Sequence, residues 1–208
     1  MTEALAEPQA DSPASPPLSR REFLSYLWGT SLALYLVGTA GALLAFALPR
    51  FEEGEFGGVI TLPVAEVPPP DSPPAEFAAG RFWLVNLGDQ ASADPRQPEG
   101  VDASPGVKAL YKVCVHLGCL YRWEPTGERF ECPCHGSKYL KDGAKIDGPA
   151  TRNLDVFVIE AVDAQGNVLA RTEPTDGSRE GSSLPIPPGT VALRVNTGAK
   201  IQGASSTV

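Results

Sequence analysis

All four cysteines and both histidines of the chain lie in one stretch, 114–139, which is 26 of its 208 residues. They form two boxes, C-V-H-L-G-C and C-P-C-H-G-S, separated by a spacer of hairpin length. Each box places a thiol and an imidazole two or three residues apart, Cys114 with His116 and Cys132 with His135. Two side chains at that spacing in one tight loop can reach the same metal. The boxes therefore predict one metal centre with two sulfur and two nitrogen ligands.

Two kinds of metal centre accept two cysteines and two histidines. Zinc takes them as a tetrahedral set, and a two-iron two-sulfur centre takes the cysteines on one iron and the histidines on the other. The second cysteine of each box, Cys119 and Cys134, is left free to bond to its counterpart. A zinc site has no need of such a pair, and disulfides persist in exported proteins. Because the chain also carries an export signal, described below, the iron–sulfur centre is favoured and zinc is the alternative.

The two boxes resemble those of the Rieske iron–sulfur proteins of cytochrome bc and bf complexes, closely at the boxes and more loosely over residues 60–196. The resemblance implies one 2Fe-2S cluster of the Rieske type. By position, Cys114 and Cys132 would ligate the inner, ferric iron. His116 and His135 would ligate the outer iron.

The same resemblance implies roles for three more residues of the boxes and for Tyr139, just after the second box. Cys119 and Cys134 form a disulfide between the two loops. The Ser137 hydroxyl bonds a bridging sulfide and the Tyr139 hydroxyl bonds a ligand thiolate. Both bonds favour the reduced state and so raise the reduction potential.

Residues beside the ligands are expected to shield the cluster. Leu117 shields the outer iron from water. Gly118 and Gly136 permit backbone conformations that bring amides close to the sulfides. The segment GPATRNL, from Gly148, resembles the proline loop that covers the cluster in this family, with Pro149 stiffening it.

The resemblance implies the electron-transfer subunit of a quinol–cytochrome c or quinol–plastocyanin oxidoreductase. A ligand imidazole exposes its second nitrogen, which accepts the proton of a membrane quinol as the ferric iron accepts one electron. We assign this contact to His135, with His116 as the second candidate. The electron then passes to a c-type cytochrome, while a b-type cytochrome takes the other electron of the quinol. A dimeric complex is implied through the family alone.

Two other functions fit part of the pattern. One is the Rieske subunit of an arsenite-oxidase-like enzyme, which can also be exported and carry the disulfide. The other is a non-redox membrane module stapled by zinc. The net charge of −8 argues against nucleic-acid binding, because that activity needs a basic face.

The N-terminal part predicts a membrane anchor. Residues 1–18 are rich in Pro, Ala and acidic residues, which predicts a disordered cytoplasmic tail. Residues 19–48 combine Arg20 and Arg21, in a twin-arginine-like export signal, with an uncharged run long enough to cross a lipid bilayer as a helix. Arginines before the run and glutamates after it place the N-terminus in the cytoplasm, by the positive-inside rule. We expect a single-pass protein of a bacterial cytoplasmic or thylakoid-like membrane, with its C-terminal domain on the periplasmic, positive side.

Residues 49–60 predict a flexible hinge, because Gly54, Gly57 and Gly58 leave the backbone unrestricted. In the Rieske family of bc-type complexes, the domain swings on such a tether between quinol and cytochrome.

Residues 61–208 predict an all-β Rieske domain. Short alternating or β-branched segments separated by Pro- and Gly-rich connections favour an antiparallel β-sandwich, with the cluster-binding part at about residues 110–152. The proline-rich segment 68–77 and the long segment 88–106 are expected to be loops, the second a family-specific insertion. The predicted strands lie in residues 60–67, 81–87, 106–113, 129–133, 154–162, 167–172 and 190–195.

Overall fold

The chain divides into two compact units, Met1–Arg50 and Phe51–Val208. The computed structural model describes residues 18–48, 56–99, 101, 103–173 and 181–206. The predicted tail lies almost wholly outside these residues.

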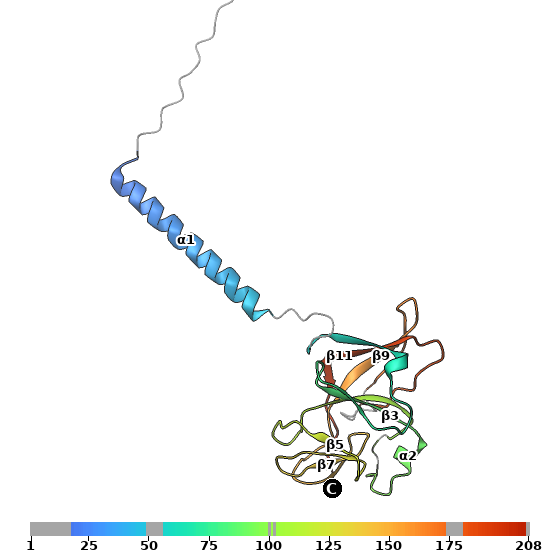
Figure 1. The fold of residues 1–208 in the computed structure, drawn as a ribbon. Helices are drawn as coiled ribbons and strands as arrows, with labels where there is room; N and C mark the ends of the chain where they lie inside the picture. Colours follow the sequence, from blue (N-terminus) through green and yellow to red (C-terminus); the bar gives the residue numbers. More distant parts are fainter. Residues whose placement is uncertain (1–17, 49–55, 100, 102, 174–180, 207–208) are drawn as a thin grey trace, which may run out of the picture. The chain divides into compact units, whose positions relative to one another are not determined.

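The described part of the first unit contains one long helix, α1 (Arg20–Ala47), seen in Figure 1. Ser19 caps it: the Glu22 amide donates to the Ser19 hydroxyl, and the Ser19 amide donates to the Glu22 carboxylate. Its 28 residues extend about 42 Å at 1.5 Å per residue, and no side chain of the helix is buried. By length and composition it can cross a membrane. The predicted helix is confirmed, and Arg20 and Arg21 form its first turn.

The described part of the second unit begins at Phe56, directly before Gly57 and Gly58, which the sequence predicts to be part of the hinge. The Gly57 amide donates to Oγ1 of Thr197 at 2.7 Å, and the Thr197 amide donates to the Gly58 carbonyl at 2.9 Å. β1 (Val59–Pro63) follows at once. Gly57 and Gly58, at the C-terminal end of the predicted hinge, are thus hydrogen-bonded to the folded domain, and the hinge itself stays a prediction. Gly54 lies outside the described residues.

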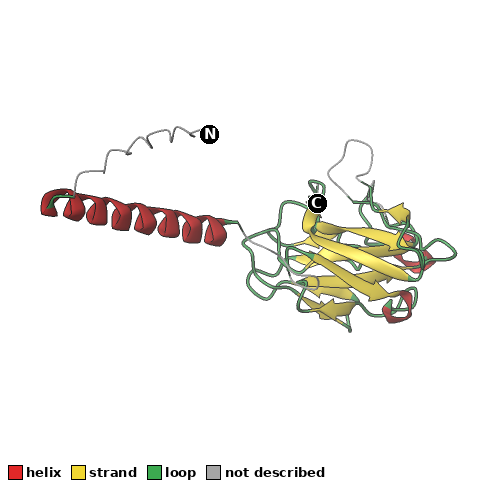
Figure 2. Ribbon diagram, turned by 90° about the horizontal axis from the view of Figure 1, so that it is seen from above, coloured by secondary structure: helices red, strands yellow, loops and turns green. Residues whose placement is uncertain are grey.

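The second unit is built on two antiparallel sheets, shown in Figure 2. The larger has the order β1-β11-β9-β4-β3-β2, with β10 also paired to β9, and the smaller has the order β5-β6-β7-β8. The strands are β1, β2 (Ala75–Phe77), β3 (Phe82–Leu87), β4 (Gly106–Tyr111), β5 (Arg122–Glu124), β6 (Arg129–Glu131), β7 (Lys138–Tyr139), β8 (Lys145–Asp147), β9 (Val156–Val162), β10 (Val168–Arg171) and β11 (Ala192–Ile201). The all-β class and the separate cluster-binding part are confirmed.

Every predicted strand segment contains a strand, but four short strands, β2, β5, β7 and β8, were not predicted. β5, β7 and β8 have two or three residues each, too few to show an alternating pattern. β2 lies inside the expected proline-rich loop and pairs with β3. The expected loop 88–106 begins with a single helical turn, α2 (Asp89–Ser92), and η1 (Val64–Glu66) follows β1 as a 3-10 turn.

Two hydrophobic cores share the strands β3 and β4, because alternate residues of a strand face opposite sides of the sheet. Phe82 and Leu84 pack into the first core, with Phe157 of β9. Trp83 and Val85 pack into the second, which also contains the cysteines and aromatic residues of the small sheet. Burial on both faces explains why the run 82–87 is almost wholly apolar. The second core also joins the small sheet to the large one.

The segment after α2 also contacts the small sheet. A guanidinium nitrogen of Arg96 donates to the Gly127 carbonyl at 2.9 Å, in the turn between β5 and β6. The side-chain amide of Gln97 donates to the buried carboxylate of Asp142 at 2.7 Å. The long loop therefore supports the cluster-binding part from one side.

Asp155, directly before β9, joins three segments of the domain. Its buried carboxylate accepts hydrogen bonds from Arg152, from Nζ of Lys200 at 2.7 Å and from the Gly203 amide at 3.1 Å. Burial alone would raise the pKa of Asp155, but these donors outweigh burial and hold the pKa below its usual value. The carboxylate is thus a stabilising charge between β9, β11 and the loop that precedes β9.

We expect Asp155→Asn to lower the free energy of unfolding by about 2 to 4 kcal/mol at neutral pH, because two cationic groups lose their buried partner. Denaturant unfolding of the domain measures the change. Asp147→Asn is the matched control, since Asp147 pairs with Lys138 at the surface and such pairs contribute less than about 1 kcal/mol.

The contribution of Asp155 should also depend on pH. A carboxyl group whose pKa is lowered by folding stabilises the protein fully above its unfolded pKa of about 3.9, and the effect disappears as the pH falls through the lower folded pKa. The wild type should therefore lose its advantage over Asp155→Asn on acidification below about pH 4. A difference that stays constant down to pH 2 would contradict the charge assignment.

Candidate metal centre

The two boxes form two loops with the same backbone closure. In the first loop, Cys114–Cys119, the Cys114 amide donates to the Cys119 carbonyl at 2.8 Å and the Gly118 amide to the Cys114 carbonyl at 3.0 Å. In the second, Cys132–Ser137, the equivalent bonds from Cys132 to Ser137 and from Gly136 to Cys132 are both 2.9 Å. Gly118 and Gly136 hold equivalent positions with φ of 81° and 76°, a region that glycine enters without strain.

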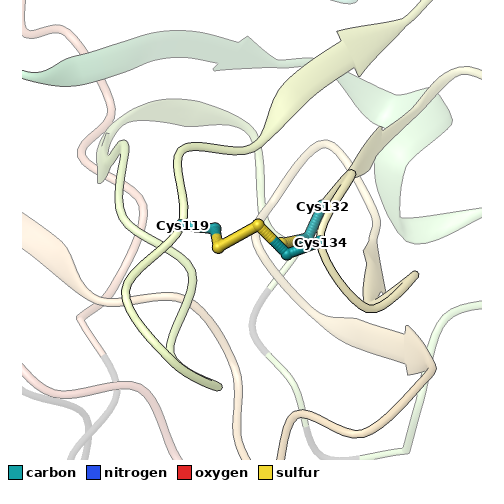
Figure 3. Close-up of side chains that lie close together, drawn as sticks. All are labelled: Cys119, Cys132 and Cys134. Carbon is teal, nitrogen blue, oxygen red and sulfur yellow. A yellow bond between two sulfur atoms is a disulfide. The ribbon is translucent and has the colours of Figure 1, made fainter.

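A disulfide between Cys119 and Cys134 joins the two loops, as Figure 3 shows. The two Cα atoms lie 6.6 Å apart. The sulfur of Cys132 lies within 4.8 Å of both sulfurs of the bridge. These three sulfurs are not a metal site as a group, because two of them are bonded to each other. The structure thus contains the disulfide between Cys119 and Cys134 that the family resemblance implied.

The remaining thiols, Cys114 and Cys132, are free and buried, at 2% and 3% exposure. Burial raises the pKa of the Cys132 thiol, and the amides of Cys134 and His135, which donate to its sulfur, oppose that effect. A buried thiolate is costly without a nearby cation, whereas metal coordination deprotonates a thiol outright. The two buried thiols are therefore suited to ligate a metal.

The two imidazoles meet at the same end of the loops. The rings of His116 and His135 lie 4.8 Å apart between centroids and stand edge to face, at 89°. His135 is exposed, and His116 is partly buried. Nδ1 of His116 is buried and has no hydrogen-bond partner among the described residues. Buried polar atoms normally have a partner, so this nitrogen is in the state expected of a metal ligand.

These observations fit a mixed-ligand cluster. Two loops contribute one buried thiol and one imidazole each, and the disulfide holds the loops together. Nδ1 of His116 distinguishes this arrangement from a purely structural pair of loops. Without a metal, this buried nitrogen would have no partner, and buried polar atoms without a partner are rare.

Ser137 and Tyr139, the predicted tuning residues, lie at the end of the second ligand loop and in the strand β7 that follows it. The Tyr139 hydroxyl is 3.2 Å from the sulfur of Cys114, and both groups are buried. Burial, and then the neighbouring Cys114, raises the pKa of Tyr139 far above its usual value, so the phenol keeps its proton as a donor. Ser137 is fully buried and its hydroxyl oxygen accepts the Ala150 amide at 3.1 Å.

The proline loop crosses directly over the second ligand loop. Gly148 has φ of 88°, and a Cβ atom there would lie 2.5 Å from Cα of Ser137. Only glycine permits this close approach. Pro149 is exposed next to it. Leu117 lies at the tip of the first loop with 68% of its surface exposed, and its shielding role stays a prediction.

Two supporting groups were not found from the sequence. Ala150 acts through its backbone amide, so its side chain gives no indication of this role in the sequence. The Asp142 carboxylate accepts hydrogen bonds from the side-chain amide of Gln97, in the long loop, and from the Ala144 amide at 3.0 Å. The contact with Gln97 is between distant segments, so no local sequence pattern indicates it.

Comparison with known proteins identifies the class that this fold and site define. A family model described as the Rieske [2Fe-2S] domain matches residues 69–158. The cytochrome b6-f complex iron-sulfur subunit 1 of Synechocystis sp. is 35% identical over 155 residues, which cover 73% of this chain and 85% of that protein. The cytochrome b6-f complex iron-sulfur subunit of Synechococcus sp. (strain JA-3-3Ab) is 33% identical over 168 residues, with 75% and 87% covered.

The chain belongs to the Rieske iron–sulfur protein family. The cofactor of this class is one 2Fe-2S cluster, and the zinc alternative is not favoured. Cys114, Cys132, His116 and His135 are the residues that would hold it.

We expect replacement of both Cys119 and Cys134 by serine to lower the stability of the domain by about 3 kcal/mol, the usual effect of a disulfide that closes a loop of this length. The cluster should also be lost faster on warming. Thermal unfolding followed together with iron release measures both effects. Equal unfolding and equal iron release would show that the bridge does not support the centre.

We expect Tyr139→Phe to lower the reduction potential with iron content unchanged, because Cys114 loses a hydrogen-bond donor that favours the reduced state. Tyr121→Phe is a matched control: Tyr121 is equally buried, but its hydroxyl donates to the Tyr111 carbonyl at 3.0 Å. Each variant should lose about 1 kcal/mol of stability, and only Tyr139→Phe should change the potential in a redox titration. Equal potentials in the two variants would remove the electronic role of Tyr139.

Proposed function

We propose that this chain is the Rieske subunit of a cytochrome bc/bf-type complex, which takes one electron and one proton from a membrane quinol and passes the electron to a c-type cytochrome. The observation that carries the proposal is the pair of imidazoles at the loop end, one exposed and one with a buried, orphaned nitrogen, next to two buried thiols. The relatives named as b6-f subunits support the same assignment. When bound, the cluster supplies reversible one-electron chemistry.

His135 is the residue to which we assign the quinol contact. Its side chain is exposed, whereas His116 is partly buried. An imidazole that ligates a metal through one nitrogen keeps the other for a proton. The exposed nitrogen of His135 would then hydrogen-bond the quinol hydroxyl and accept its proton. His116 is the second candidate.

The surface beside His135 suits an apolar partner. Leu117 of the first loop and Leu120, directly after that loop, expose 68% and 57% of their surfaces. Exposed apolar side chains around a polar group are typical of sites that bind an apolar ligand or another protein. This surface would receive the quinol ring and the adjoining face of a b-type cytochrome.

Helix α1 would anchor the chain in the membrane with its N-terminus in the cytoplasm, since Arg20 and Arg21 begin it. The domain would then lie on the positive side, where a c-type cytochrome can meet it. The predicted hinge, residues 49–60, would be the tether for domain movement, with Gly57 and Gly58 at its C-terminal end hydrogen-bonded to β11. The complex is expected to be a dimer.

The composition of the native complex tests the proposal. We expect the full-length chain, purified from membranes through a tag on its N-terminal tail, to bring with it a subunit with b-type haem and a subunit with c-type haem. Addition of quinol should reduce the c-type haem, and removal of this chain should abolish that reaction. Haem spectroscopy and an assay of arsenite oxidation on one sample decide the outcome. Arsenite oxidation without either haem would replace the proposal by the arsenite-oxidase-like alternative, which the relatives do not favour.

A further inference from the structure

The C-terminal residues Gln202–Ser206, here termed the C-terminal strap, follow β11 and run alongside the segment 151–153. The Asn153 amide donates to the Ala204 carbonyl at 2.9 Å, and the Ser206 amide donates to the Thr151 carbonyl at 3.1 Å. A β-bridge pairs Arg152 with Ser205. The strap is thus an additional antiparallel partner for the chain that leads out of the proline loop.

The proline loop in turn contacts the metal centre. Ala150, next to Thr151, donates its amide to the hydroxyl oxygen of Ser137. A hydroxyl that accepts one bond at its oxygen keeps its own proton for a different partner. The position of the Ala150 amide therefore decides where the Ser137 hydroxyl lies and which way its proton can point.

The strap fits against the domain with no space to spare. A Cβ atom on Gly203 would lie 2.2 Å from the carbonyl oxygen of Asn153 and 2.7 Å from that of Leu154. Both contacts are with backbone atoms, which cannot turn aside as a side chain can. The Gly203 amide also donates to Asp155, so the strap is fixed to β9 and to the loop before it.

We propose that the C-terminal strap is a positioning element of the metal centre. It holds residues 151–153, these residues hold the Ala150 amide, and the amide orients the Ser137 hydroxyl. Release of the strap should leave the ligands in place but free the hydroxyl, and so lower the reduction potential. The proposal rests on the assignment of the cluster to this site, and not on the identity of the partner proteins.

Two variants release the strap in different ways. Gly203→Ala forces it away from Asn153. Ser206→Pro removes the amide that donates to Thr151, together with the Ser206 hydroxyl, near the end of the strap, so this variant should fold even if the first does not. Ser205→Ala is the control, because Ser205 is exposed and pairs through its backbone.

Hydrogen exchange and a redox titration on the full-length, cluster-loaded protein test the proposal. The Asn153 amide reports release of the strap, and the Ala150 amide reports its effect at the centre. In the released variants we expect both amides to exchange at least about tenfold faster, with the reduction potential lowered and iron content unchanged. Ser205→Ala should match the wild type.

Two results would overturn the proposal. One is fast exchange at Asn153 with no change at Ala150 or in the potential, since the strap would then be free without effect on the centre. The other is unchanged exchange at Asn153 in both variants, since the strap would then not hold this segment. Zinc in place of iron in the wild type would instead contradict the proposed function, while the exchange rates would still measure positioning of Ala150.

Discussion

The metal centre depends on holding two separate loops in one relative position. Each loop is closed by its own pair of backbone bonds and contributes one thiol and one imidazole, so neither could complete the centre alone. The disulfide between Cys119 and Cys134 is the covalent link between them. Its two sulfurs lie within 4.8 Å of the sulfur of Cys132, and His135, which directly follows Cys134, remains exposed.

The rest of the domain supports this arrangement in layers. Alternate residues of β3 and β4 build a core on each face of the large sheet, and the second core includes both buried thiols with the aromatic side chains that surround them. The proline loop covers the second ligand loop at the distance that Gly148 allows. Asp155 and the C-terminal strap hold the far end of that loop. The centre is thus connected by hydrogen bonds to the C-terminal strap, residues 202–206.

The sequence predicted the parts whose chemistry is local. The spacing in the two boxes indicated the ligands, the uncharged run indicated α1, and alternation indicated the longer strands. The disulfide pairing followed from family resemblance and is present in the structure. Two causes account for what was missed. β7 and β8 are too short to show a pattern, and the roles of Asp155 and Gly203 arise from contacts between segments about 48 residues apart.

The central claim is that Cys114, Cys132, His116 and His135 together hold one 2Fe-2S cluster. The most direct test is electron–nuclear double resonance spectroscopy on the reduced, full-length protein with ¹⁵N-labelled histidine. Iron, zinc and inorganic sulfide are measured on the same sample. We expect about two irons and two sulfides per chain, with nitrogen couplings from two imidazoles. A silent spectrum with one zinc per chain, or an iron–sulfur signal without histidine coupling, would contradict the account.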